Sequence, residues 1–306
     1  MSNLFEHCRG GVSKTQSKIV KKYGYKIVSN NISLTINKGD IYGFIGRNGA
    51  GKTTAMRLIL GLARPTSGKI KLFNSDDLNA QRKKIGSLIE APGLYKRCSA
   101  LENMKRFSIL YGGDDKEIEE LLSFVGLNGV GNKKVGQFSL GMKQRLGIAI
   151  ALLGNPEVLI LDEPVNGLDP AGIKEVRDLL LKLNKEKNVT IMISSHLLDE
   201  LAKITTKYGI INNGVLVEEI DAQKLMERCK NNIVISCDRL QEAKELLESE
   251  LKLTNISIVN DKLHIVDEIE STDEINTLLV KNDFKVHEIT INKNSFEDYF
   301  IERLGR

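Results

Sequence analysis

The sequence has few cysteines and histidines, and it lacks long apolar runs. The four cysteines among 306 residues, Cys8, Cys98, Cys229 and Cys237, do not have the spacing of a disulfide framework or a zinc site. The four histidines are scattered, which argues against a zinc cluster. No apolar run approaches the roughly 18 residues of a membrane-spanning helix, and the first residues lack the apolar centre of a signal peptide. We therefore expect a soluble protein of the reducing cytoplasm.

Residues 46–54 read GRNGAGKTT, which fits the phosphate-binding pattern G-x-x-x-x-G-K-[ST]. Glycines let the backbone approach a ligand closely, and the exposed N–H groups form an anion site at the start of the next helix. Lys52 would reach the β- and γ-phosphates of a nucleotide, and the Thr53 hydroxyl would bind Mg²⁺. The remaining predicted contacts are Arg47, Asn48, Gly49, Ala50, Gly51 and Thr54.

The residues around this loop favour the phosphate-binding interpretation over a glycine-rich turn that contains a lysine by chance. Residues 40–45 are predicted to form a short buried strand, and residues 54–60 a helix. Strand, loop and helix in this order are the context that the pattern requires.

Two continuous apolar runs, 156–163 (PEVLILDE) and 188–195 (NVTIMISS), predict parallel strands buried on both faces. The first run ends in two carboxylates. Asp162 is placed to hold Mg²⁺, and Glu163 to act as general base or to polarise the attacking water. The alternative is that both carboxylates only solvate the end of a strand.

Other local patterns predict an alternation of strands and helices, which is typical of a parallel sheet with helices on both faces. Alternation at 31–36 and the run KIKLF at 69–73 predict two strands. A helical block at 99–153 interrupts this order. Within it we expect a capping box from Ser99 to Glu102, a helix capped by Asp114 or Asp115, and a helix over 142–153.

Charge divides the sequence near residue 228. Residues 1–229 contain 34 Lys and Arg against 24 Asp and Glu, whereas residues 230–306 contain 10 against 16. We expect an irregular segment at 1–17, a first domain at 18–228 and an accessory domain at 229–306. The basic balance of the first domain suits a nucleotide or the anionic face of a membrane, or else it reflects a solvated lysine-rich surface.

The accessory domain has its own pattern of β-α-β-β-α-β, the ferredoxin-like order. Its predicted strands are 233–237, 256–259, 263–266 and 284–289, and its predicted helices are 240–251 and 272–281. A last amphipathic helix at 296–304 packs back on the protein or meets a partner. We find no catalytic cluster here and expect a regulatory or dimer-contact role.

The motifs together resemble those of ATP-binding cassette (ABC) ATPases. The phosphate loop, FSLGMKQR at 138–145, LILDEP at 159–164, GLD at 167–169 and SSH at 194–196 occur in the family's order. The resemblance covers about residues 20–220. It implies an α/β P-loop NTPase fold with a mostly parallel sheet core, an antiparallel β subdomain and an α-helical subdomain at about 88–153. ATP and Mg²⁺ are the implied cofactors.

The resemblance also assigns roles to individual residues. Ser139 and Gly141 match the signature motif, which contacts the γ-phosphate of ATP bound by a second copy. The neighbouring Leu140 and Met142 depart from the common signature LSGGQ. Asp169 resembles the aspartate that links the two cassettes. His196 resembles the histidine that contacts the γ-phosphate. The aromatic that stacks on adenine would be Tyr23 or, as the alternative, Tyr25.

Two departures from the family pattern are evident. Glu90 occupies the place of a glutamine that touches Mg²⁺ and the membrane partner, so it is both a predicted metal contact and a predicted catalytic residue. A glutamate there, and the ending SFEDYF at 295–300, resemble the ATPases of exporters for lantibiotic immunity and bacitracin resistance. At the other end, residues 1–17 do not have the pattern of the family's first strand.

The resemblance implies an ATP-hydrolysing subunit that dimerises around ATP and drives separate integral membrane permease subunits from the inner face of the cell membrane. The cargo would be an antimicrobial peptide or an antibiotic, and nucleic acid is not an expected partner. The alternatives are a soluble ABC ATPase of ribosomes or DNA and an unrelated P-loop kinase or GTPase. A single cassette without a heptad run disfavours the first alternative. The signature motif and the lack of NKxD disfavour the second.

Overall fold

The computed structural model describes residues 19–23, 26–30, 32–73, 75–229, 232–266, 272–292 and 295–304. The predictions for residues 1–17 and for Tyr25 lie outside the described residues, as does the side chain of Tyr23. The chain forms two compact units, and the first contains residues up to Ala222 together with those from Arg303 onward. The second unit is Gln223–Glu302. The domain boundaries that charge predicts remain predictions.

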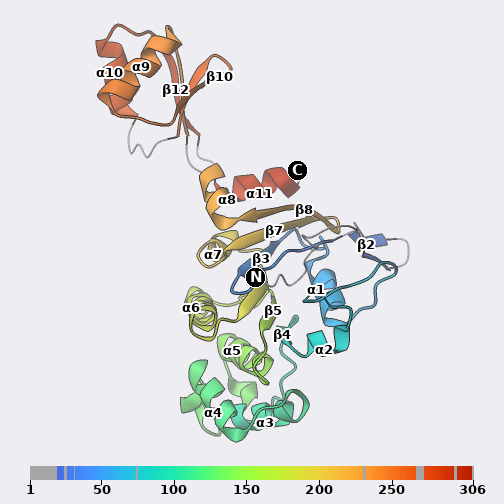
Figure 1. The fold of residues 1–306 in the computed structure, drawn as a ribbon. Coiled ribbons are helices and arrows are strands. Elements are labelled where there is room, and N and C mark those ends of the chain that lie inside the picture. Colours follow the sequence, from blue (N-terminus) through green and yellow to red (C-terminus); the bar gives the residue numbers. More distant parts are fainter. Residues whose placement is uncertain are drawn as a thin grey trace. The chain divides into compact units, whose positions relative to one another are not determined.

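Unit 1 is built on a six-stranded sheet of order β4-β5-β6-β3-β7-β8 (Figure 1). All neighbours are parallel except β8, which is antiparallel to β7. Every residue of β3, β5 and β6 is buried, as expected for central strands covered on both faces. The predicted mostly parallel core is therefore confirmed. The strands are β3 (Ile41–Ile45), β4 (Ile85–Leu88), β5 (Val158–Asp162), β6 (Thr190–Ser194), β7 (Lys207–Asn212) and β8 (Val215–Asp221).

Helices cover both faces of this sheet, with α1 on one side and α6 on the other (Figure 1). A separate antiparallel pair, β1 and β2, precedes β3. The elements are β1 (Val20–Tyr23), β2 (Lys26–Asn30), α1 (Lys52–Leu60), α2 (Leu78–Arg82), α6 (Pro170–Lys187) and α7 (Leu198–Ala202). None of the described helices is long and apolar enough to cross a membrane.

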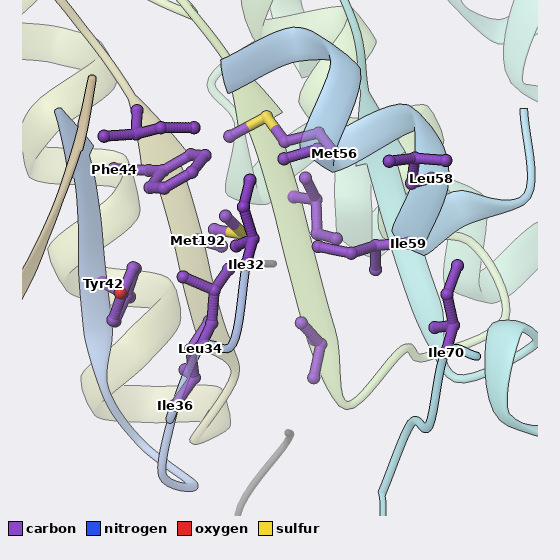
Figure 2. Close-up of a cluster of buried hydrophobic side chains, with 14 of the residues drawn as sticks. Ile32, Leu34, Ile36, Tyr42, Phe44, Met56, Leu58, Ile59, Ile70 and Met192 are labelled. Carbon is purple, nitrogen blue, oxygen red and sulfur yellow. The ribbon is translucent and has the colours of Figure 1, made fainter. Parts of the chain in front are cut away.

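The core between α1 and the sheet is drawn in Figure 2, where Met56 and Ile59 point from the helix toward Phe44, Met192 and neighbouring side chains. Met56 and Phe44 are fully buried. Burial of side chains of this size stabilises the fold by about 1.5–3 kcal/mol each. The cluster thus fixes the start of α1, and with it the phosphate loop, against the ends of the central strands.

The helical block contains α3 (Ala100–Tyr111), α4 (Asp115–Phe124), the short 3₁₀ turns η1 (Asn128–Val130) and η2 (Val135–Gln137), and α5 (Leu140–Ala151). The predicted capping box is confirmed, since Ser99 and Glu102 exchange both hydrogen bonds. Asp114 caps α4. Ser139 caps α5, which begins at Leu140. The predicted start at residue 142 is therefore wrong by two residues.

Two predicted strands are absent. Residues 32–36 show the expected alternation, with Ile32, Leu34 and Ile36 buried, but they do not pair with a strand. The backbone of Thr35 forms hydrogen bonds with side chains instead: Glu219 accepts from its N–H, and Lys207 donates to its carbonyl oxygen. Within the described part of the chain, residues 69–73 pair only through the isolated bridge from Leu72 to Ser75. The alternation of apolar residues therefore correctly predicted which side chains are buried. It did not predict whether a neighbouring strand is available for backbone hydrogen bonds.

The hairpin of β7 and β8 is not anticipated by the sequence analysis, although its turn has a strong signal. Asn213 and Gly214 join the strands, and their φ angles are +47° and +77°. Positive φ at both central residues defines the type I′ turn, for which Asn-Gly is the preferred sequence. The hairpin lies beside β3, the strand that leads into the phosphate loop.

We expect Gly209→Ala to destabilise unit 1. A Cβ at Gly209 would lie 2.0 Å from the hydroxyl oxygen of Tyr42, which is buried and donates to Oε1 of Glu219 at 2.7 Å. Burial raises the pKa of Tyr42 well above its ordinary value, and Glu219 adds to this, so the phenol stays protonated. Overpacking of this kind costs about 1–3 kcal/mol. Thermal unfolding measures it. Gly129→Ala is the control, since no atom lies within 4 Å of its added Cβ; equal melting temperatures would contradict the prediction.

Unit 2 contains a four-stranded antiparallel sheet of order β10-β11-β9-β12. With the chain order β-α-β-β-α-β, this is the predicted ferredoxin-like arrangement, which is confirmed. The elements are β9 (Asn232–Cys237), α9 (Leu240–Glu250), β10 (Ile256–Val259), β11 (Lys262–Ile265), α10 (Asp273–Lys281) and β12 (Val286–Asn292). Their apolar core includes Ile235, Leu247, Leu263 and Leu279. The helices α8 (Ala222–Arg228) and α11 (Phe296–Leu304) stand at the two ends of the unit.

Candidate functional site

The loop between β3 and α1 has the close backbone packing that a phosphate cradle needs. A Cβ at Gly46 would lie 2.5 Å from the carbonyl oxygen of Ile211. Gly51 has a φ of +108°, and a Cβ there would lie 2.4 Å from the carbonyl oxygen of Val28. Only glycine fits these two positions. Arg47, Asn48 and Gly49 at the loop tip are exposed.

Lys52 is the first residue of α1 and is only 6% exposed. Its ammonium donates to the carbonyl oxygen of Gly46 at 2.6 Å and lies 3.7 Å from Oε1 of Glu163. The cation is therefore held inside the loop beside the helix N-terminus, where an anion is favoured. A phosphate that binds here meets a buried positive charge at the N-terminus of α1.

Asp162 ends β5 and is 2% exposed. Its carboxylate accepts from the Thr53 hydroxyl at 2.7 Å and from the Ser194 hydroxyl at 2.6 Å. These contacts join the ends of β5 and β6 to the first turn of α1. Ser194 was part of the SSH motif but had no predicted role, although a polar residue that ends an apolar strand beside a strand with a terminal carboxylate is a usable signal.

The oxygens of Thr53 and Asp162 fit Mg²⁺, which takes oxygen ligands and is bound by one or two protein groups together with phosphates and water. Among the described residues, no group of three or more His, Cys, Asp and Glu side chains is placed to hold a metal. The donor set thus suits a metal that is held together with the phosphates of a nucleotide.

Glu163 follows Asp162 in the left-handed backbone region, with a φ of +50°. Its N–H donates to the Ser194 hydroxyl oxygen at 3.0 Å. Its carboxylate accepts from Nδ1 of His196 at 2.7 Å and from the His196 N–H at 3.3 Å. The turn directs both consecutive carboxylates toward one site, which an extended strand would prevent. Backbone strain held by surrounding contacts is common at functional sites.

Ser139 and Asp169 lie at the N-termini of α5 and α6. Ser139 accepts from the Met142 N–H at 3.2 Å, and Asp169 accepts from the Gly172 N–H at 3.0 Å. Leu140, which follows Ser139, is 46% exposed. Gly141 is open, since the nearest atom to an added Cβ is 3.9 Å away. Both helix ends can therefore be approached by a ligand or by another chain.

Glu90 lies apart from this cluster in the described contacts. It has a φ of +62°, and its exposed carboxylate forms an ion pair with Arg57 of α1. Arg57 was not identified from the sequence, because the two residues are 33 positions apart and no local pattern indicates this pair. Glu90 is thus fixed to the helix that begins with Lys52.

The structure brings together five of the predicted residues: Lys52, Thr53, Asp162, Glu163 and His196. Ala50, Gly51 and Thr54 belong to the same loop and helix start. Ser139, Gly141, Asp169 and Glu90 have no described contact with these five side chains. Tyr23 ends β1 and pairs through its backbone with Lys26, while its side chain lies outside the described residues.

Comparison with known proteins gives a consistent result. Residues 29–166 match the family described as ABC transporter. The bacitracin transport ATP-binding protein BcrA of Bacillus licheniformis is 42% identical over 292 residues, covering 94% of this chain and 95% of that protein. The lantibiotic transport ATP-binding protein SrtF of Streptococcus pyogenes is 45% identical, covering 70% of this chain and 94% of that protein.

A solved structure has the same fold as unit 1. The dimeric ATP-binding cassette MJ0796, in a post-hydrolysis state bound to ADP and phosphate, is 26% identical. It aligns with a TM-score of 0.60 and covers 72% of this chain and 99% of its own. The similarity therefore spans the whole of that cassette.

Proposed function

Because this chain belongs to the ATP-binding proteins of the ABC transporter family, we propose that it powers an exporter of an antimicrobial peptide or antibiotic through separate permease subunits. The family membership makes it an ATPase coupled to transport. The observation that carries the proposal is the convergence of Lys52, Asp162 and Glu163 at the carboxyl ends of the central strands. In this proposal the chain acts at the inner face of the cell membrane, where its permease partners hold it.

Nucleotide binding is assigned to the loop and the start of α1. Backbone N–H groups of residues 47–54 cradle the phosphates, and the Lys52 ammonium moves from the Gly46 carbonyl to the β- and γ-phosphates. Thr53 and Asp162 would hold Mg²⁺ through their oxygens. When bound, Mg²⁺ neutralises charge that develops on the phosphates. Tyr23 is the proposed contact for adenine.

Hydrolysis is assigned to Glu163 and His196. The Glu163 carboxylate accepts a proton from the attacking water, or polarises that water. His196 donates from Nδ1 to this carboxylate and so orients the carboxylate. In this proposal the His196 ring also contacts the γ-phosphate. The Lys52 ammonium lies near the Glu163 carboxylate. In this proposal the ammonium moves to the phosphates when ATP binds, and the Glu163 carboxylate is then free to act as the base.

Two copies are proposed to act together. The exposed N-terminus of α5, with Ser139 and Gly141, would face the γ-phosphate on the partner copy, and Asp169 would link the two cassettes. A helix N-terminus favours an anion at this position. The dimeric state of the similar cassette MJ0796 supports this pairing.

Light scattering after size exclusion tests the ATP-dependent pairing. Glu163→Gln, which should bind ATP without hydrolysing it, is measured with and without ATP. We expect a monomer that becomes a dimer only with ATP. Glu163→Gln combined with Ser139→Glu is the matched control, because a carboxylate at the start of α5 repels the partner's phosphate while leaving the phosphate loop unchanged. If Glu163→Gln alone stayed monomeric at saturating ATP, this result would contradict pairing by the chain without its permease partners.

The proposed cargo is an antimicrobial peptide or antibiotic. Relatives that are 42% and 45% identical are named for transport of bacitracin and of a lantibiotic. The test is the minimal inhibitory concentration of each compound for a sensitive bacterium that expresses this chain with its permease subunits. Lys52→Ala in the same cells is the control. Unchanged sensitivity to both compounds, with the complex present in the membrane, would exclude this cargo class.

We expect Glu90→Gln to retain ATPase activity while requiring more Mg²⁺. A carboxylate near the metal favours the metal-bound state, and an amide does so less. Half-saturation should therefore shift to higher Mg²⁺ by about 2- to 5-fold, which corresponds to the roughly 0.4–1 kcal/mol of an interaction screened by water. Phosphate release measured across a Mg²⁺ titration gives this value. Arg57→Gln separates the effect of the ion pair from that of the metal. Identical titrations for Glu90→Gln and the native chain would place this carboxylate away from Mg²⁺.

A further inference from the structure

The turn of the β7–β8 hairpin supports the phosphate loop from behind. The Gly214 N–H donates to the carbonyl oxygen of Ala50 at 2.8 Å, and the Gly214 carbonyl accepts from the Asn30 N–H at 2.7 Å. A Cβ at Gly51 would lie 3.5 Å from the Cα of Gly214. One residue of the turn therefore connects the phosphate loop to β2. The position of Gly214 therefore affects the backbone of the phosphate loop.

The same hairpin holds the end of α11. Nδ2 of Asn212, the residue before the turn, donates to the carbonyl oxygen of Leu304 at 2.7 Å. Nε of Arg303 donates to Oε2 of Glu218 in β8 at 2.8 Å. The last carbonyls of a helix have no partner inside the helix, and a cation in the last turn is favoured there. Asn212 and the Arg303–Glu218 ion pair thus fasten the end of α11 to both strands of the hairpin.

These two sets of contacts lie on one short segment, because Asn212 and Gly214 belong to the same turn. Asn212 is two residues from Gly214, and the type I′ turn between them fixes the backbone. A change in the position of Asn212 therefore moves Gly214 and its hydrogen bond to Ala50. Nothing in the proposed catalysis uses α11 directly, so any effect of α11 on the site passes through the hairpin.

We propose that Arg303 and Leu304 are positioning residues for ATP binding: the end of α11 holds the β7–β8 hairpin against the phosphate loop. This inference rests on the proposed function, because it concerns the affinity of that loop for ATP. The residues do not touch the nucleotide. They act through Asn212, Gly214 and the backbone of Ala50.

The test measures binding of a fluorescent methylanthraniloyl-ATP and steady-state phosphate release in the full chain. Asn212→Asp replaces the amide donor with a carboxylate that repels the Leu304 carbonyl, and Arg303→Glu reverses the charge beside Glu218. For each variant we expect KM and Kd for the nucleotide to rise about five- to tenfold, in the lower range of coupling between two sites. The kcat at saturating ATP should stay within about twofold, because Glu163 and His196 are untouched.

Two controls separate positioning from general stability. Arg303→Glu combined with Glu218→Arg restores the ion pair in reverse and should return Kd toward the native value. Lys262→Glu makes the same charge change at an ion pair of similar length, 2.7 Å to Glu288, within unit 2. It should leave Kd unchanged. Melting temperatures are recorded for every variant, and Arg303→Gln replaces any variant that does not fold.

The outcomes are distinct. If the native chain does not bind the fluorescent nucleotide, the proposed function fails. If it binds and the variants bind equally well, even with lower melting temperatures, the attachment of α11 is only structural and this inference is overturned. A rise in Kd that the reversed ion pair does not rescue would also overturn the role of Arg303.

Discussion

Lys52→Ala is expected to lower the affinity for ATP by about 10- to 150-fold, the equivalent of one charged hydrogen bond worth about 1.5–3 kcal/mol. Lys52 is the cation held inside the loop, buried and bonded to the Gly46 carbonyl. Alanine removes this charge from the phosphate site and keeps the glycine cradle. Binding of methylanthraniloyl-ATP to the full chain measures the loss.

A lysine on the same unit provides the matched control. Lys38 lies in the turn before β3 and is exposed, so Lys38→Ala removes one positive charge without touching the loop. Its Kd should equal that of the native chain. Circular dichroism establishes that both variants are folded. If a folded Lys52→Ala bound ATP with native affinity, the loop would not be the phosphate site.

Glu163→Gln is expected to reduce turnover by about 10²–10⁴-fold, the usual contribution of general acid–base catalysis. Glutamine has the size of glutamate and can accept from His196, but it does not take up a proton from water at neutral pH. The backbone at φ +50° and the Ser194 contact to the N–H remain available to it. ATP binding should therefore persist while kcat falls. Phosphate release at saturating ATP gives kcat.

Glu157→Gln is the control for this substitution. Glu157 lies just before β5, at the opposite end of the strand from Glu163, and its exposed carboxylate pairs with Lys84. Turnover of this variant should be native. Native turnover in Glu163→Gln would remove this residue from the mechanism, and loss of ATP affinity in it would indicate a role in binding rather than in catalysis.

The parts of the fold that the sequence predicted depend on local patterns. The phosphate loop has a fixed spacing, β5 and β6 are continuous apolar runs, and Ser99 caps its helix through residues within one turn. Each of these patterns is complete within about ten residues, so no distant partner is needed to interpret it.

The parts of the fold and of the site that the sequence did not predict depend on residues that are distant in the chain. Residues 32–36 alternate like a strand, but Glu219 and Lys207 take the backbone groups of Thr35 that a neighbouring strand would need. In the site, the Ser194 contact to Asp162 and the Arg57 contact to Glu90 join residues 32 and 33 positions apart. The Asn213-Gly214 turn, by contrast, has a local signal, because Asn-Gly is the preferred sequence of a type I′ turn.

The path of the chain through the two units has a thermodynamic consequence. The chain leaves unit 1 at Ala222 and returns to it at Arg303, so unit 2 is an insertion rather than a tail. If unit 2 melts while unit 1 stays folded, Gln223–Glu302 becomes an unfolded loop whose two ends are held by unit 1. The fixed ends lower the conformational entropy of this unfolded loop and so stabilise the folded state of unit 2. Releasing the end of α11 would open this loop. Unit 2 would then melt at a lower temperature although none of its own core contacts had changed.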